Sequence, residues 1–550
     1  MGTDTGQLPG AVRLGWLAWM LLALAWFATV PLRPLFDPDE GRYAEIPREM
    51  LASGDWVTPR LNNLKYFEKP PLQYWATAAT YELLGVGEAS SRLWGVGLAF
   101  GCLPLIYLWT RRLYGVRSAL AALVALAVSP FFVVVAHLNL LDQAFTFFLI
   151  TAVLAFAYAQ CRPPRSHEER TWMLTAWAAA ALAVLSKGIV VGVLAGGALV
   201  VYTLLERDTL TWRRLHLALG VPLFLLIAAP WFVLVTLRNP SFPRFFFVHE
   251  HFARFLTTVH SRVEPWWFFL PLLLIGVLPW GGSFLGALRA RVPAGGADPG
   301  AAAPFKPLRF LVIFAGITLV FFSASGSKLA PYILPILPPL AVLAGVTAPD
   351  PDAFTRQAAR IGAALVAFVG LGLLAYSARH NSFVPRAAAG WAAAGILLAL
   401  AAVFATMRRL RAAPTRAALA TALAAVLAWQ CLMSAFALVP PARSARDLVR
   451  SVRPLISAHT PLYSVGQYRE TISPYLGRTL QLAGYEGELQ FGLSEEPQKR
   501  MTLEDFTERW RSGGQAVAFF EPDVWDRLRR AGLPGRVLAF DYHTVAVSRL

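Results

Sequence analysis

Two adjacent acids and a lysine lie at opposite ends of one polar segment, and their types suit acid–base and phosphate chemistry. Asp39 and Glu40 are neighbours in FDPDEGRY, and Lys69 precedes two prolines in YFEKPP. A carboxylate can act as a general base or a metal ligand, and a lysine can stabilise a leaving phosphate. The prolines restrict the backbone beside Lys69 and so hold its direction. We therefore predict a reaction centre in segment 36–71, with helix capping as the alternative role of the acid pair.

Other charged candidates interrupt apolar stretches elsewhere in the chain. Asp142 lies within LNLLDQAFTFFLI, and Lys187 is the one cation between two apolar runs. An ionisable group in such a setting is a functional candidate by default. The alternative for Lys187 is an ordinary turn with a lysine that extends to the membrane surface.

The loop 238–265 is rich in histidine, arginine and phenylalanine, which suits a helix lying in the membrane interface. Its histidines lack HExxH spacing, so the sequence does not support a zincin. His249 is either a metal ligand shared with a remote carboxylate or a hydrogen-bonded structural histidine. Cations that could bind phosphate follow in this loop and in the later SKLAPY loop: Arg244, Arg254, Arg262 and Lys328.

These residues must be positioned by a membrane protein. The chain has 550 residues, of which 56% are hydrophobic and 15% charged, whereas soluble proteins carry about 25% charged residues. Helices are the simplest way to satisfy backbone groups in lipid. We predict an α-helical polytopic membrane protein with about 13 transmembrane helices, each close to 20 apolar residues long.

The net charge of +17 follows from arginine and lysine in alternate short loops. Such loops face the cytoplasm, so the charge does not indicate nucleic acid. This topology places the loop 33–90 and the C-terminal residues on the opposite, outer face. The three cysteines form neither a disulfide framework nor a CxxC metal motif.

Two domains are expected: 1–440, a transmembrane domain that includes loop 33–90, and 441–550, a small α/β domain on the outer face. Its expected strands and amphipathic helices are Leu462–Val465, Ala516–Phe520, Val537–Phe540, Val545–Ser548, Leu503–Arg511 and Pro522–Arg530. Within loop 33–90, Gly41–Leu51 is predicted to be an interfacial helix. The charges of Glu45, Arg48 and Glu49 are expected to be solvated there.

Several motifs together resemble one family. FDPDEGRYAEIPREMLASGDWVTPRLNNLKYFEKPP, LLDQAF, LSKG, FVHEHFARF and SKLAPYILPILPP are similar to motifs of the lipid A aminoarabinose transferases. These are bacterial relatives of protein O-mannosyltransferases in the GT-C class, and the resemblance covers about residues 10–440. It implies an inverting, monomeric glycosyltransferase that moves a sugar from undecaprenyl phosphate to an acceptor at the periplasmic face of the inner membrane. Lipid A phosphate is the leading acceptor, and no nucleotide cofactor or nucleic acid is expected.

The resemblance also implies roles for individual residues. Asp39 is the principal catalytic carboxylate, and Asp142 supports it. The family's positions for binding the donor phosphate correspond to Arg42, Lys69, Lys187, Arg254 and Tyr332. Glu68 and His249 match a pair that can hold a divalent metal, zinc or magnesium.

The residues are also compatible with two other functions. Relatives with this core transfer other sugars to proteins or other glycans. A lipid or sugar transporter or flippase would instead show inverted repeats and interrupted midplane helices. The concentration of charge in outer loops favours an enzyme.

Overall fold

The structure is a computed structural model that describes most of the chain. The described residues are 15–253, 264–281, 305–379, 386–409, 414–439, 443–485 and 487–549. Within them, seven helices are long and apolar enough to cross a membrane, or eight if the bent pair α5 (Val116–Val128) and α6 (Pro130–Ala136) counts as one span. The helical membrane class is confirmed, and the thirteen expected spans stay a prediction.

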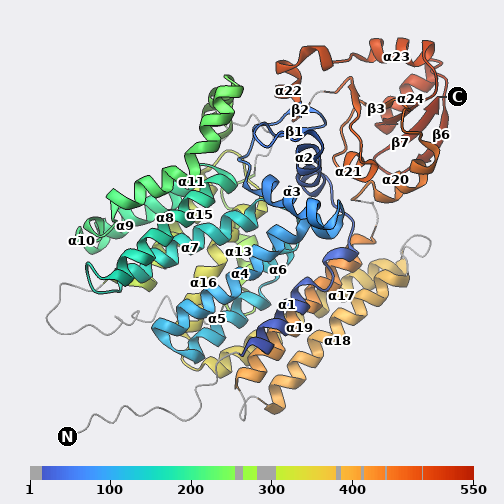
Figure 1. Ribbon diagram of the computed structural model, residues 1–550. Helices are drawn as coiled ribbons and strands as arrows, with labels where there is room; N and C mark the ends of the chain where they lie inside the picture. The colour runs from blue at the N-terminus through green and yellow to red at the C-terminus, as the bar shows by residue number, and fades with distance from the viewer. Residues whose placement is uncertain are drawn as a thin grey trace, which may run out of the picture.

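The apolar helices pack side by side, and the first of them, α1, lies against the last, α19 (Figure 1). The seven spans are α4 (Glu88–Tyr114), α7 (Asp142–Gln160), α11 (Leu217–Arg238), α15 (Pro307–Ala324), η4 with α16 (Ala330–Thr347), α17 (Pro351–Arg379) and α19 (Pro414–Ala437). The other helices of the bundle are α1 (Trp16–Phe27), α3 (Leu72–Leu84), α8 (His167–Lys187), α9 (Gly197–Glu206), α13 (Phe269–Val277) and α18 (Arg386–Arg409).

The break between α5 and α6 has a local cause. The two helices meet at an angle of 65°. Pro130 has no backbone N–H to continue the helix, and the Ser129 hydroxyl accepts a hydrogen bond from the N–H of Phe132 instead. The same hydroxyl donates to the carbonyl of Gly276 at 2.7 Å, which ties the break to α13. One apolar segment of the sequence is therefore two helices.

Helix α2 (Asp39–Ser53) lies at one end of the bundle beside the short hairpin of β1 (Arg60–Leu61) and β2 (Leu64–Lys65). The expected helix is confirmed, but the expected solvation of its charges is wrong. Glu45 and Glu49 are buried, and Arg48 donates to Glu45 at 2.6 and 2.7 Å. Arg48 also donates to the carbonyl of Gly477 at 3.2 Å, because the C-terminal domain covers this face of α2.

Burial makes the stability of this region depend on pH. Burial, and then the negative charge of Glu45, raise the pKa of Glu49 well above its usual range. Between its ordinary unfolded pKa and this raised folded pKa, the folded state holds the extra proton, so stability falls as the pH rises. We expect Glu49→Gln, which keeps an acceptor for the N–H of Asn63, to raise the Tm by about 1–2 °C at pH 8 and by less at pH 5.

Thermal unfolding at the two pH values measures this effect. Glu82→Gln, at an exposed position of α3, is the matched control and should change neither value. Equal Tm changes for Glu49→Gln at both pH values would contradict the assignment.

The C-terminal domain is the expected α/β unit. Its five strands stand in the order β4-β3-β5-β7-β6, with β3 parallel to β4 and β5 and the last three antiparallel. The strands are β3 (Leu462–Val465), β4 (Gln481–Ala483), β5 (Ala516–Phe520), β6 (Arg536–Phe540) and β7 (Val545–Arg549), and the helices include α20 (Arg446–Val452), α21 (Ile472–Leu476), α22 (Gln490–Glu495), α23 (Leu503–Ser512) and α24 (Pro522–Arg530). The four expected strands and two expected helices are confirmed; β4 was not foreseen, since three residues carry little periodicity.

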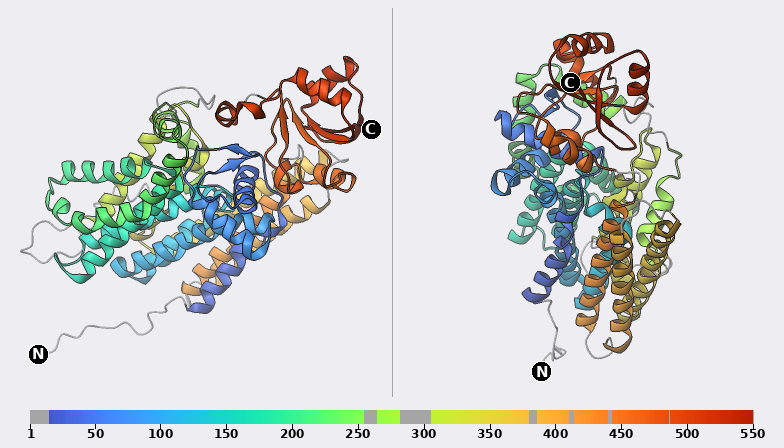
Figure 2. Two further views of the ribbon diagram at one scale, coloured as in Figure 1. Left: turned by 45° about the horizontal axis from the view of Figure 1, so that its top comes forward. Right: turned by 90° about the vertical axis from the view of Figure 1, so that its right-hand side faces the viewer.

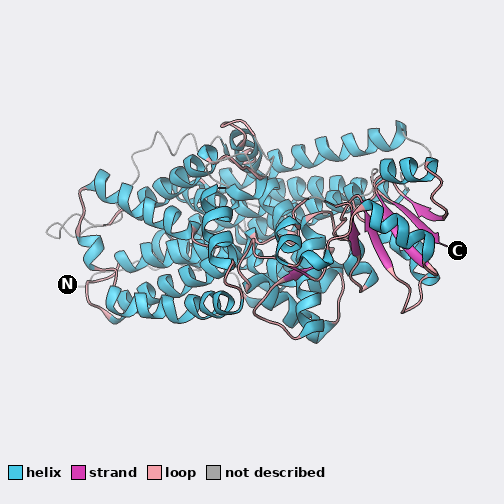
Figure 3. Ribbon diagram, turned by 90° about the horizontal axis from the view of Figure 1, so that it is seen from above, coloured by secondary structure: helices cyan, strands magenta, loops and turns pink. Residues whose placement is uncertain are grey.

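The five-stranded sheet lies at one side of a mainly helical molecule (Figure 3). In both views of Figure 2 the C-terminal domain caps the end of the bundle that carries α2 and the β1–β2 hairpin. The polar segment after α1 is therefore enclosed between the bundle and this domain.

Candidate active site

Asp39 and Arg42 lie one turn apart at the start of α2. Arg42 donates to Asp39 at 2.6 Å, pairs with Glu488 through both its Nε and Nη2, and lies 3.9 Å from Glu470. The Arg42 side chain is only 4% exposed, whereas that of Asp39 is 35% exposed. Asp39 is therefore held in place by an arginine while it still faces open space.

Its neighbour Glu40 has a different environment. Arg92 donates to both carboxylate oxygens of Glu40, at 2.7 and 2.9 Å, and the N–H of Asn139 donates at 2.8 Å. Burial disfavours the charge, but Arg92 outweighs it and holds the pKa of Glu40 below its usual range. Both oxygens are occupied, so Glu40 anchors α2 to the bundle and Asp39 is the acid of the pair that can do chemistry.

Lys69 lies among carboxylates at the other end of the polar segment. Its Nζ is 3.3 Å from Oε2 of Glu250 and 2.8 Å from the carbonyl of Glu68. Burial and the negative charge of Glu250 raise the pKa of Glu68, against the opposing charge of Lys69. Glu250 belongs to the π-helical turn η3 (Arg244–Ala253), which brings the loop after α11 to this lysine.

Asp142, Lys187 and Tyr332 come together from three elements. Asp142 is the first residue of α7 and Lys187 the last of α8, so the two antiparallel helices place them side by side as an ion pair. The Lys187 ammonium lies 4.3 Å from the centre of the Tyr332 ring, at the start of η4. This is a favourable cation–π distance. The structure therefore groups three of the residues that the resemblance singled out.

The Asp142 group is connected to α2 by hydrogen bonds. The backbone N–H of Asn139 donates to Glu40, and the side-chain oxygen of Asn139 accepts a hydrogen bond from the Gln73 amide at 3.0 Å. Asn139 precedes Asp142 by three residues. The two charged groups thus belong to one end of the bundle.

An apolar cavity of about 620 Å³ is lined by residues on either side of Lys187 in the sequence, but not by Lys187 itself. Val184, Ile189 and Val191, which flank the lysine in sequence, line it together with Phe232 and Phe247. Its other walls come from α7, α9, α11 and Phe310 of α15. The chain segment that carries Lys187 therefore borders a cavity suited to hydrocarbon.

The predicted metal pair does not by itself make a metal site. His249 stacks on Phe245, with ring centres 5.3 Å apart, and Glu68 lies next to Lys69. In the described part of the chain, no group of three or more His, Cys, Asp or Glu side chains is arranged to hold an ion. The metal stays a prediction from the resemblance. Arg254 lies outside the described residues.

Residues that the sequence did not single out complete the site. Glu470 and Glu488 come from the C-terminal domain, and Phe491 of that domain stacks on Phe245 at 3.9 Å. Arg42 and Glu488 are 446 positions apart, so no local pattern could have joined them. Glu250 follows His249, the predicted metal ligand, in the sequence. Its carboxylate next to that candidate was the one feature of the sequence that could have indicated a place in the site.

The C-terminal domain is docked on the segment before α2. Arg469 donates to Asp37 at 2.8 Å and to Asp541 at 2.5 Å, and the N–H of Thr471 donates to Asp37 at 2.9 Å. A Cβ atom on Gly41 would lie 2.6 Å from the carbonyl carbon of Glu470. The glycine thus permits backbone contact between α2 and the domain that supplies Glu488.

Replacing this glycine tests the docking. We expect Gly41→Ala to destabilise the protein by about 1–3 kcal/mol through overpacking and to lower transfer activity, because Arg42 and Glu488 would separate. Thermal unfolding and a transfer assay measure the two effects. Gly372→Ala in α17 is the control, since its Cβ would meet no atom within 4 Å. Wild-type behaviour of Gly41→Ala would rule out a close contact here.

Comparisons with known proteins agree with this geometry. The model of the dolichyl-phosphate-mannose-protein mannosyltransferases matches residues 13–246, and that of the aminoarabinose transferase C-terminal domain matches residues 448–549. An undecaprenyl phosphate-alpha-4-amino-4-deoxy-L-arabinose arabinosyl transferase of Pseudomonas aeruginosa (strain UCBPP-PA14) is 32% identical, over 94% of this chain and 95% of its own. A protein of the same name from Edwardsiella ictaluri is 32% identical over 66% of this chain and 64% of its own.

Solved structures extend the likeness to three dimensions. The crystal structure of ArnT from Cupriavidus metallidurans bound to undecaprenyl phosphate is 36% identical and covers 98% of this chain and 99% of its own, with a TM-score of 0.86. The same protein in the apo state gives a TM-score of 0.84, with 97% of both chains covered.

The fold and site define a multi-pass inner-membrane glycosyltransferase that uses a polyprenyl-phosphate-linked sugar. More narrowly, the chain belongs to the family of undecaprenyl phosphate–aminoarabinose transferases. The family expected from the motifs is confirmed.

Proposed function

We propose that the protein transfers 4-amino-4-deoxy-L-arabinose from undecaprenyl phosphate to a phosphate of lipid A at the periplasmic face of the inner membrane. The observation that carries this proposal is the apolar cavity bordered by the residues on either side of Lys187 in the sequence. A polyprenyl chain needs an apolar wall, and its phosphate needs a cation. The name of the Pseudomonas aeruginosa relative and the undecaprenyl phosphate in the Cupriavidus metallidurans structure support the same donor.

The proposed chemistry is transfer with inversion. The bond between the sugar and the carrier phosphate breaks as an acceptor oxygen attacks the sugar from the opposite side. Lys187 and Lys69 stabilise the negative charge that develops on the departing phosphate, and Arg254 is a further predicted cation. Asp39 faces open space and takes the acceptor proton or orients the acceptor oxygen. A phosphate hydroxyl is already acidic, so a weak base is sufficient.

Arg42 has a more limited role in this proposal. Asp39 and Glu488 occupy its guanidinium, and the side chain is nearly enclosed. A donor phosphate at Arg42 would have to replace these partners. Arg42 therefore holds Asp39 in orientation, and its direct binding of phosphate stays a prediction.

The charge of the loops supports the periplasmic side. The basic loops 161–171 and 206–214 follow the ends of α7 and α9 that lie away from Asp142 and Lys187. The positive-inside rule assigns such loops to the cytoplasm. The site and the C-terminal domain then face the periplasm.

The deciding experiment is mass spectrometry of lipid A from cells with the wild-type protein, with Asp39→Asn, or with neither. We expect the added mass of aminoarabinose only with the wild type. A matched assay in proteoliposomes uses the lipid-linked sugar and purified lipid A. Unmodified lipid A together with a newly glycosylated protein or glycan would contradict the assignment of lipid A as the acceptor. Movement of the lipid-linked sugar across the bilayer without a new glycosidic bond would indicate a flippase and contradict the assignment as a transferase.

A further inference from the structure

A second, basic pocket lies where the C-terminal domain meets the turn between α3 and α4. It has a volume of about 230 Å³ and shares no lining residue with the site around Asp39, Lys69 and Lys187. Its lining residues are Leu35, Ala44, Tyr81, Val86, Gly87, Glu88, Ser91, Arg446, Val449, Arg450, Arg453, Pro474 and Tyr475. The proposed transfer reaction uses none of these side chains.

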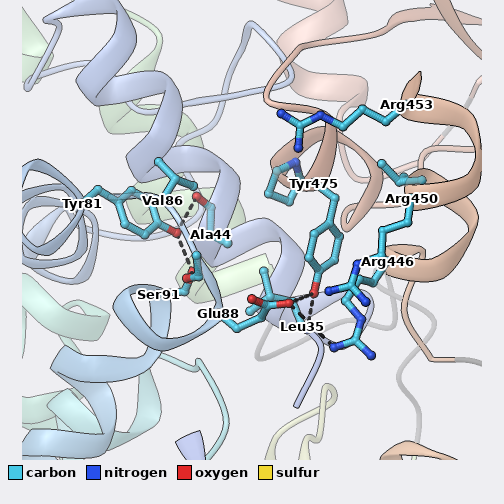
Figure 4. Close-up of a pocket in the computed structure, with 13 residues that line it drawn as sticks. Leu35, Ala44, Tyr81, Val86, Glu88, Ser91, Arg446, Arg450, Arg453 and Tyr475 are labelled. Carbon is cyan, nitrogen blue, oxygen red and sulfur yellow. Dashed lines mark hydrogen bonds and ion pairs between the residues drawn. The ribbon is translucent and has the colours of Figure 1, made fainter. Parts of the chain in front are cut away.

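Three arginines give the pocket its charge. Arg446, Arg450 and Arg453 extend from the α20 side towards the turn that carries Val86 and Glu88 (Figure 4). Glu88 is the one acid in the lining, and Arg446 lies 3.9 Å from it. An arginine guanidinium binds phosphate oxygens through paired N–H groups. The excess of arginine therefore favours an anionic, phosphate-bearing ligand.

The acids near the arginines leave this excess in place. Asp447 lies 3.3 Å from Arg446 and 3.7 Å from Arg450, but its side chain is 83% exposed, so water weakens both pairs. The Tyr475 hydroxyl donates to Glu88 at 3.2 Å and accepts from the N–H of Leu35 at 2.8 Å. Glu88 is thus partly occupied by the tyrosine. Arg450 and Arg453 remain exposed at the entrance.

The position of the pocket indicates that the ligand is a lipid. The membrane span α4 begins at Glu88, so the lining residues Val86 to Ser91 lie where the chain enters the hydrocarbon. Just before this turn, Leu83 is 81% exposed and Leu84 is 67% exposed, as expected for side chains that contact acyl chains. Arginines at this depth meet lipid headgroups.

We propose that the arginine pocket binds the phosphate headgroup of an anionic membrane lipid, at a site separate from the donor. The lipid would join α20 of the C-terminal domain to the turn between α3 and α4. Its acyl chains would lie against Leu83 and Leu84. The inference does not depend on which sugar or acceptor the enzyme uses.

Native mass spectrometry of the full-length protein in detergent tests this binding. The protein is titrated with phosphatidylglycerol, with zwitterionic phosphatidylcholine, and with inorganic phosphate alone. We expect the wild type to prefer phosphatidylglycerol, and Arg450→Gln/Arg453→Gln to weaken that binding on the order of tenfold. Because both side chains are exposed, the variant should fold normally, which its Tm checks.

The matched control is Arg527→Gln/Arg530→Gln, two exposed arginines of α24 in the same domain that do not line the pocket. It should bind phosphatidylglycerol like the wild type. Equal weakening in the control and pocket variants would overturn the site. If phosphatidylcholine bound as well as phosphatidylglycerol, the preference for an anionic headgroup would be wrong. If inorganic phosphate alone bound as well as phosphatidylglycerol, the ligand would not have to be a lipid, and the proposal would be wrong. Transfer activity enters none of these readouts, so a failure of the proposed function would be seen separately.

Discussion

Asp39→Asn is expected to lower the rate of sugar transfer by about 10²–10⁴-fold, the range for loss of a positioned general base. The asparagine oxygen can still accept the hydrogen bond from Arg42, so α2 should stay in place and the Tm should change little. The loss would then be chemical and not structural. Initial rates in proteoliposomes, with donor and acceptor varied in turn, measure it.

Two further variants test whether the loss is specific to the Asp39 carboxylate. Asp39→Glu keeps a carboxylate but moves it by one methylene, and should recover part of the rate. Glu82→Gln removes an acid at an exposed position of α3 and should have no effect. Transfer by Asp39→Asn at the wild-type rate would show that the reaction does not use this carboxylate.

Lys187→Gln should have the next largest effect, about 10²–10³-fold in kcat/KM, the range for loss of one stabilising charged or polar group. Lys187 pairs with Asp142, and its neighbours in the sequence line the apolar cavity. Asp142→Asn would leave the lysine without its carboxylate but still charged. Because Lys187 stabilises charge that develops on the departing phosphate, we expect Lys187→Gln to lower kcat more than it raises the KM for the donor. Asp142→Asn should lower kcat by less, because the lysine keeps its charge.

The double variant separates a shared role from two independent ones. Residues in contact that act together give non-additive effects, so Asp142→Asn/Lys187→Gln should lose less than the product of the single losses. Lys306→Gln is the control. Lys306 forms a similar ion pair with Glu206, but it precedes the first residue of α15 and so lies at the end of that helix away from η4 and Tyr332. Strictly additive losses would mean that Asp142 and Lys187 act independently.

The sequence alone was sufficient for the features that depend on local pattern or composition. Hydropathy identified the helical membrane class, and amphipathic spacing identified α2, α23 and α24. The motifs around Asp39, Lys69 and Asp142 identified the family. Each of these features depends on residues that are close together in the sequence, so the local pattern of side chains is enough to predict it.

One expectation failed because it depended on distant neighbours. Glu45 and Glu49 have the spacing of a solvated helix face, yet the C-terminal domain buries them. A contact absent from the local pattern decided the structure.

The polar segment after α1 shows both contributions. Its residue types indicated chemistry, and its position after one apolar helix indicated a membrane surface. The resemblance singled out Asp39, and the tertiary structure supplied the physical reason, since Arg92 and Asn139 occupy the carboxylate of Glu40 while Asp39 stays 35% exposed. The pairing of Arg42 with Glu488 was likewise decided by folding, because an ion pair across 446 residues forms only when the C-terminal domain closes over the bundle.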